Sequence, residues 1–213
     1  LTSMKFEIRS AAFPLIAVTI AVFILQFVLG DWFTESFLLS SADIFTRPWI
    51  LITHIFLHGS PLHLFYNMWG LFMFGPLLES RIGAKRFLAF YLSAGVIAGF
   101  LSSFFYPSSL GASGAIMGVI GMLIILMPNL KLLVFYVVPT PLWLAGIIYA
   151  AMDTFGVFFP SGVGNIAHLA GMGFGLLYGL YLKNQSAKFT RKFAKKKNLN
   201  EVDVDEYLRS GRI

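Results

Sequence analysis

Six long apolar runs divide the chain, and they restrict its fold more than any other feature. A helix of about 20 residues crosses a hydrocarbon core of roughly 30 Å, and most of these runs approach that length. Inside lipid the backbone has no water to bind, so each run must satisfy its own hydrogen bonds as a helix. The pattern predicts an all-α polytopic membrane protein, a bundle of six transmembrane helices. The runs are residues 12–29, 62–78, 87–105, 112–127, 141–155 and 164–182.

Composition supports a membrane-embedded chain. Hydrophobic residues make up 57% of the sequence and charged residues 12%, so a surface in water would carry large apolar patches. We expect a cytoplasmic N-terminal tail over residues 1–11, a membrane domain over 12–183 and a basic and acidic cytoplasmic tail over 184–213. The chain has no cysteine, which excludes a thiol nucleophile.

The positions of the charges give the orientation. With six spans and a cytoplasmic N-terminus, fifteen of the sixteen Lys and Arg residues fall on the inner side, and Arg47 alone falls outside. Positive charge accumulates on the cytoplasmic side of membrane proteins, so both termini are predicted to be cytoplasmic. The net charge of +6 therefore reflects the orientation of the chain in the membrane. We expect the protein in a cell inner (plasma) membrane, with lipid but no nucleic acid as a partner.

Polar residues cluster near the outer starts of three predicted helices. His63 and Asn67 are four residues apart on the second helix and so project from one face. Ser113 lies in a Gly-Ala-Ser-Gly turn at the start of the fourth helix, and His168 opens the sixth. Polar groups at membrane depth are costly and usually functional. Their common depth predicts one shared site.

The helix that Ser113 opens is short. The run from Ala112 to the break at Pro128 contains sixteen residues, or roughly 24 Å at about 1.5 Å per residue. Its outer end should therefore lie below the membrane surface, in a water-filled depression. Unpaired N–H groups at that helix start favour a developing negative charge.

This arrangement favours acyl transfer by a serine nucleophile. We expect His168 to take the Ser113 proton and return it to the leaving amine, while the Ser113 N–H, His63 and Asn67 hold the oxyanion. A stripe of glycines that includes Gly171 should let the sixth helix approach the fourth. Asp153 is the one carboxylate considered as a third member, and the prediction is a Ser–His dyad without it. No cofactor or metal is predicted.

At these residues the chain resembles the rhomboid family of intramembrane serine proteases. The resemblance implies a six-helix core, a Ser113 and His168 dyad, supporting roles for His58, Gly111, Gly114 and Gly171, and cleavage of single-span membrane proteins near the outer face. It also implies that the loop over residues 156–163 caps the site and moves for access. The motifs that carry it are His58-x4-His63-x3-Asn67, Glu79-x-Arg81-x-Gly83, Gly111-x-Ser113-Gly114 and Ala167-His168-x-x-Gly171-x-x-x-Gly175.

Two alternatives remain open from the residues alone. His54, His58 and His63 are close enough in sequence for a histidine-ligated metal hydrolase, although no carboxylate accompanies them in an H-E-x-x-H pattern. A non-catalytic membrane-protein binding or transport protein with the same six helices is the other alternative.

Overall fold

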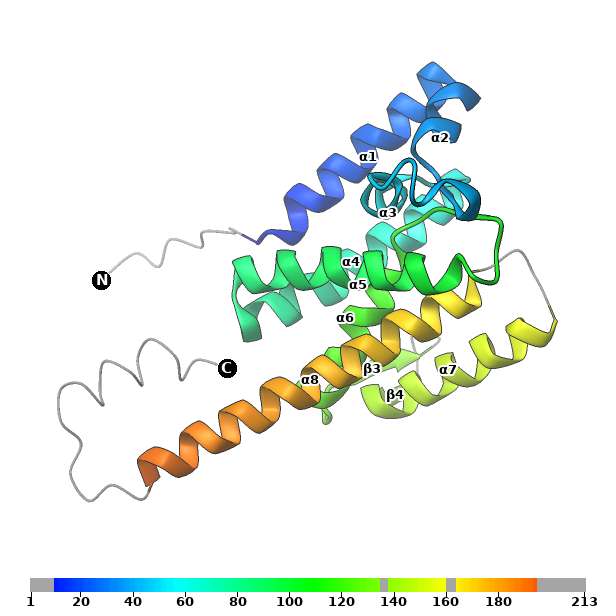
Figure 1. The fold of residues 1–213 in the computed structure, drawn as a ribbon. Helices are drawn as coiled ribbons and strands as arrows, with labels where there is room; N and C mark the ends of the chain where they lie inside the picture. The colour runs from blue at the N-terminus through cyan, green and yellow to red at the C-terminus, as the bar shows by residue number, and fades with distance from the viewer. Residues whose placement is uncertain (1–9, 135–137, 160–163, 195–213) are drawn as a thin grey trace, which may run out of the picture.

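The computed structural model describes residues 10–134, 138–159 and 164–194. Its long helices each cover one of the six apolar runs, which confirms a mostly helical chain (Figure 1). The start of α1, the α4–α5 turn and the end of α8 lie at one end of the bundle. The helices are α1 (Ala12–Leu29), α4 (Pro61–Ile82), α5 (Ala84–Ser102), α6 (Ser113–Leu126), α7 (Leu142–Phe158) and α8 (Asn165–Ala194).

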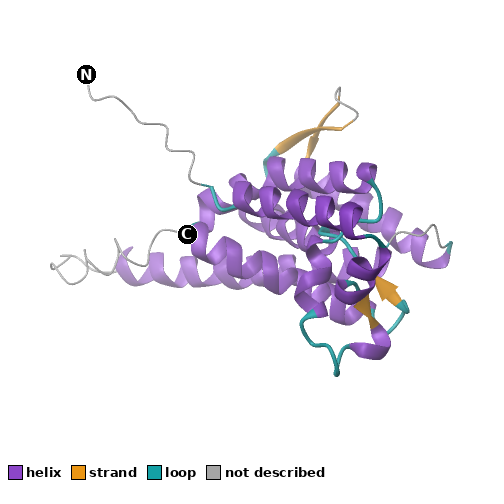
Figure 2. Cartoon of the chain, turned by 90° about the horizontal axis from the view of Figure 1, so that it is seen from above, coloured by secondary structure: helices purple, strands orange, loops and turns teal. Residues whose placement is uncertain are grey.

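The connections between the helices also form two small two-stranded sheets, which leave the chain mostly helical as predicted. Strand β1 (Leu39–Ser40) pairs antiparallel with β2 (Ser108–Ser109), and β3 (Lys131–Val134) pairs antiparallel with β4 (Val138–Pro141). Strand β4 contains Pro139 and Pro141, two residues that do not fit a helix interior. Figure 2 shows the two sheets on different sides of the helices. Short helices fill the first long connection: α2 (Asp31–Phe37), η1 (Ser41–Asp43), α3 (Ile50–Thr53) and η2 (His54–Phe56).

The outside of the bundle is apolar. By length and hydropathy, α1 and α5 are the described helices that could cross a membrane, while α6 and α7 are shorter apolar helices. Large apolar side chains stand exposed along most of the long helices, as lipid-facing residues do. Examples are Ile24, Phe27, Phe65, Leu101, Ile147, Phe155 and Leu177.

Helix α6 forms the centre of the bundle. Every residue from Gly114 to Leu123 is buried, and α6 contacts α4, α5, α7 and α8. A helix that is apolar on all sides is stable only when it is surrounded. Ser113, the first residue of α6, is therefore positioned by the packing of α6 against four other helices.

The glycines of α8 bring this helix against the backbone of α6, as the sequence predicted. A Cβ on Gly171 would overlap the Gly114 carbonyl oxygen, and a Cβ on Gly175 would overlap the Gly118 carbonyl oxygen. Small residues permit such close approach between membrane helices, where dispersion contacts carry much of the stability. Gly173 lies on another face, and a Cβ there would meet nothing within 4 Å.

Glu79 ties the end of α4 to the start of α1. Its carboxylate accepts hydrogen bonds from the Ala11 N–H at 2.9 Å, the Ala12 N–H at 3.4 Å and the Ser10 hydroxyl. The first N–H groups of a helix have no partner within it, and a carboxylate there also suits the helix dipole. This explains why an acidic residue stands near the C-terminal end of the apolar helix α4.

We expect Gly175→Ala to destabilise the protein strongly and Gly173→Ala to leave it unchanged or slightly more stable. The first substitution pushes α8 away from α6, while the second adds a methyl group in open space and a better helix former. Thermal unfolding in detergent micelles measures both. Equal melting temperatures for the two variants would contradict this packing.

Glu79→Ala should lower the free energy of unfolding by about 1–3 kcal/mol, because the N–H groups of Ala11 and Ala12 lose their acceptor. Ser80→Ala is the matched control, since the exposed Ser80 hydroxyl bonds only to the Leu77 carbonyl nearby. Denaturant unfolding and amide hydrogen exchange at the start of α1 test the difference. Unchanged exchange in Glu79→Ala would show that the cap is not needed.

Candidate active site

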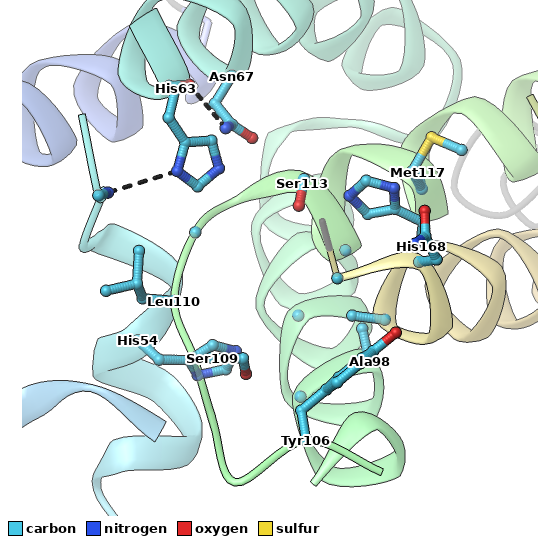
Figure 3. Close-up of a pocket in the computed structure, with 18 of the residues that line it drawn as sticks. His54, His63, Asn67, Ala98, Tyr106, Ser109, Leu110, Ser113, Met117 and His168 are labelled. Carbon is cyan, nitrogen blue, oxygen red and sulfur yellow. Dashed lines mark hydrogen bonds between the residues drawn. The ribbon is translucent and has the colours of Figure 1, made fainter. Parts of the chain in front are cut away.

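A cavity of about 960 Å³ opens between the starts of α4, α6 and α8 and the end of α5. Its lining includes the four residues predicted to share a site, which are His63, Asn67, Ser113 and His168. Figure 3 shows their side chains converging from α4, α6 and α8. The structure thus brings together three segments that are far apart in the sequence.

Ser113 is the first residue of α6, and the preceding turn sets its position. Gly111 has φ +124°, a conformation that favours glycine, and a Cβ there would lie 2.8 Å from Cε1 of His63. The Gly111 N–H donates to the carbonyl of His54 at 2.8 Å. Gly114 packs on Ala98, where a Cβ would come within 2.6 Å of the Ala98 Cβ. Gly111 and Gly114, two of the three glycines predicted to support the site, therefore each have a steric reason.

His168 lies in the first turn of α8 and faces Ser113 across the cavity (Figure 3). Its Nδ1 is 2.9 Å from Oδ1 of Asp153 on α7. A neutral imidazole that donates from Nδ1 to a carboxylate leaves Nε2 free to accept a proton. Among the described residues no hydrogen bond joins Ser113 Oγ to His168, and such bonds are often long before substrate binds.

His63 and Asn67 occupy one face of α4 at the cavity wall. Ser60 caps this helix by accepting from the His63 N–H at 3.1 Å. His63 Nδ1 accepts from the Gly59 N–H at 3.4 Å, which leaves the ring proton on Nε2, beside Gly111. Asn67 Nδ2 donates to the His63 carbonyl at 2.9 Å and retains a second N–H. Both side chains line the same cavity as Ser113.

The other two histidines support the wall of the cavity. His58 is buried, and its ring makes an edge contact with that of His63 at 4.9 Å between centroids. The buried His54 places its Nδ1 2.9 Å from the Ile50 carbonyl oxygen and packs against Gly99. In the described part of the chain, no group of three or more His, Cys, Asp or Glu residues is arranged to hold a metal ion.

Sequence reasoning missed two polar anchors of the site. Gln26 on α1 accepts from the His58 N–H at 2.9 Å and donates to the His58 carbonyl at 3.4 Å. The Tyr106 hydroxyl accepts from the Ile166 N–H at 3.4 Å, at the start of α8. Gln26 is a polar residue inside an apolar run, and this signal could have identified it.

The connection between α1 and α4 is held to the site at several points. Besides the β1–β2 pair, the Ser41 N–H donates to the Pro107 carbonyl at 2.9 Å. Arg47 donates to the Glu35 carbonyl at 3.1 Å and pairs with Asp43. Hydrogen bonds from Arg47 and Ser40 keep the pKa of the Asp43 carboxyl below its usual value. The predicted capping loop at 156–163 falls partly outside the described residues, which end at 159 and resume at 164.

Comparison with known proteins gives the family. A model of the rhomboid domain matches residues 46–185, well over half of the chain. The sequence is 33% identical over 199 residues to "Rhomboid protein 1, mitochondrial" of Saccharomyces cerevisiae, covering 88% of this chain and 57% of the relative. It is 34% identical over 171 residues to the human "Presenilin-associated rhomboid-like protein, mitochondrial", covering 74% of this chain and 42% of the relative.

A bacterial relative is similar over much of the same region. "Rhomboid protease GlpG" of Haemophilus influenzae is 29% identical over 135 residues, covering 63% of this chain and 69% of that protein. The chain spans about half the length of the yeast and human relatives. The domain match and these identities show that the chain belongs to the rhomboid family, a family of membrane proteins.

Proposed function

We propose that the protein is an intramembrane serine endopeptidase that uses Ser113 as nucleophile and His168 as base. The observation that carries the proposal is the convergence of these two side chains in one cavity, at the end of the bundle opposite the α4–α5 turn. The family supports it, because one relative is named a rhomboid protease. The metal-hydrolase and non-catalytic alternatives make no use of a serine at a helix N-terminus facing an imidazole.

The proposed reaction begins when the Ser113 hydroxyl attacks a peptide carbonyl and passes its proton to Nε2 of His168. The oxygen of the tetrahedral intermediate then carries negative charge. The Ser113 N–H, His63 Nε2–H and the free Asn67 N–H are the donors available for it. His168 next protonates the leaving amine, and water hydrolyses the acyl-enzyme by the same steps in reverse order.

The substrate we propose is a transmembrane segment of a single-span protein. A carbonyl within a membrane helix is already hydrogen-bonded and shielded, so the segment must unwind locally before attack. Residues that weaken a helix should therefore mark good substrates. Cleavage near the outer face follows from the position of the cavity, at the end of the bundle that carries few basic residues.

The proposed setting is a cell inner membrane that the six long helices cross, with both termini cytoplasmic. Arg81, Lys85 and Arg86 lie at the α4–α5 turn, and Lys183 and Lys188 lie toward the C-terminal end of α8. These are on the same end of the bundle in Figure 1. Positive charge at one end supports a cytoplasmic location for that end and an outward-facing cavity.

Ser113→Ala and His168→Ala should each abolish cleavage of a single-span substrate in reconstituted vesicles, because either change removes the nucleophile or its base. Ser103→Ala is the matched control, since within the described part of the chain the half-buried Ser103 hydroxyl bonds only to the Phe100 carbonyl. Product formation by gel electrophoresis and mass spectrometry measures the effect. Turnover retained by purified Ser113→Ala would exclude the mechanism.

Asn67→Ala should lower kcat without abolishing activity, because the loss of one oxyanion donor typically costs about 2.7–4 kcal/mol while the others remain. KM should change little if the donor acts mainly in the transition state. Steady-state kinetics and a melting curve separate this role from a packing defect. A wild-type kcat in the variant would remove Asn67 from the oxyanion site.

A further inference from the structure

Asp153 is an ionisable residue in an apolar environment that the proposed reaction leaves unused. It is the one charged residue in α7, and it is 7% exposed. It lies on the inward face of α7 together with Leu142, Ala145 and Gly146. An ionisable group inside an apolar helix is costly and usually has a function with an identifiable partner.

The partner is His168. The Oδ1 atom of Asp153 lies 2.9 Å from Nδ1 of the imidazole, and both side chains are largely buried. Within the described residues, Asp153 makes no other side-chain hydrogen bond. The carboxylate therefore contacts the Nδ1 edge of the imidazole, which is the edge that points away from Ser113.

We propose that Asp153 is a positioning residue that holds His168 with its proton on Nδ1 and Nε2 directed at Ser113. The inference rests on the proposed function and adds a third member to its Ser–His pair. An acceptor at Nδ1 fixes the tautomer and ring orientation, and a carboxylate there also stabilises the imidazolium that forms when Ser113 loses its proton. This differs from the dyad that the sequence predicted.

The position of Asp153 on α7 makes packing an insufficient reason for its presence. Gly146, on the same face, fits against Ile124 of α6, where a Cβ would overlap the Ile124 side chain. Leu142 and Ala145 are fully buried beside it. The inner half of α7 is thus attached by apolar contacts, while a buried leucine at 153 would fill the space at lower cost than a carboxylate.

Asp153→Leu and Asp153→Asn test the proposal with the full-length protein in reconstituted vesicles. Leucine removes the acceptor, and asparagine keeps an oxygen but loses the charge. We expect kcat to fall at least tenfold in Asp153→Leu. In Asp153→Asn we expect a larger fall, toward the roughly 10⁴-fold loss seen when the triad aspartate of a serine protease becomes asparagine, because the amide can donate to Nδ1 and favour the wrong tautomer. KM and the melting temperature should stay close to wild type. Thr154→Ala, at an exposed neighbour on α7, is the matched control.

Nitrogen NMR of labelled histidine gives a readout that does not depend on turnover. Wild-type and Ser113→Ala proteins should both show His168 protonated at Nδ1, and Asp153→Leu should lose that preference. A wild-type kcat in Asp153→Leu, or a proton on Nε2 in the wild type, would overturn the inference while Ser113-dependent cleavage still upheld the proposed function. Absence of Ser113-dependent cleavage in the wild type would instead overturn both.

Discussion

The contact between α6 and α8 is the constraint on which the site depends. Gly171 of α8 lies against the carbonyl of Gly114, so the two backbones approach as closely as helices can. Ser113 immediately precedes Gly114, and His168 lies one turn before Gly171. The same glycine contact that holds the bundle together therefore sets the distance between the proposed nucleophile and its base. Any side chain at Gly171 would push α8 away from α6 and would also move His168 away from Ser113.

Hydrogen bonds to the connecting segments hold the site in addition to the glycine contact. The turn before Ser113 is held by a hydrogen bond from the Gly111 N–H to the His54 carbonyl. The backbone of His58 is held by two hydrogen bonds with the Gln26 side chain. These bonds satisfy backbone groups that would otherwise be unpaired in an apolar bundle. A cavity lies beside them at the N-terminal end of α6. A hydrolytic reaction needs such a cavity, because water must reach the acyl-enzyme.

Much of this could be predicted from the sequence, because apolar length and helix caps are local signals. A helix over the apolar run 62–78 and the glycine contact of α8 are both found in the structure. The hairpin formed by β3 and β4 was missed, because an apolar run does not show whether it pairs with the strand that follows. The Asp153 contact was missed for another reason. It depends on how α7 is rotated, and α7 is apolar on nearly every face, so its sequence gives little information on that rotation.

The most direct test of the central claim is covalent labelling by a fluorophosphonate, followed by identification of the modified residue by mass spectrometry. Only a serine whose proton can be taken by a neighbouring base reacts quickly with this reagent. We predict that Ser113 is labelled in the folded protein and that labelling is lost in His168→Ala, while the many other serines stay unmodified. Absence of label on Ser113, or equal labelling in His168→Ala, would contradict the account.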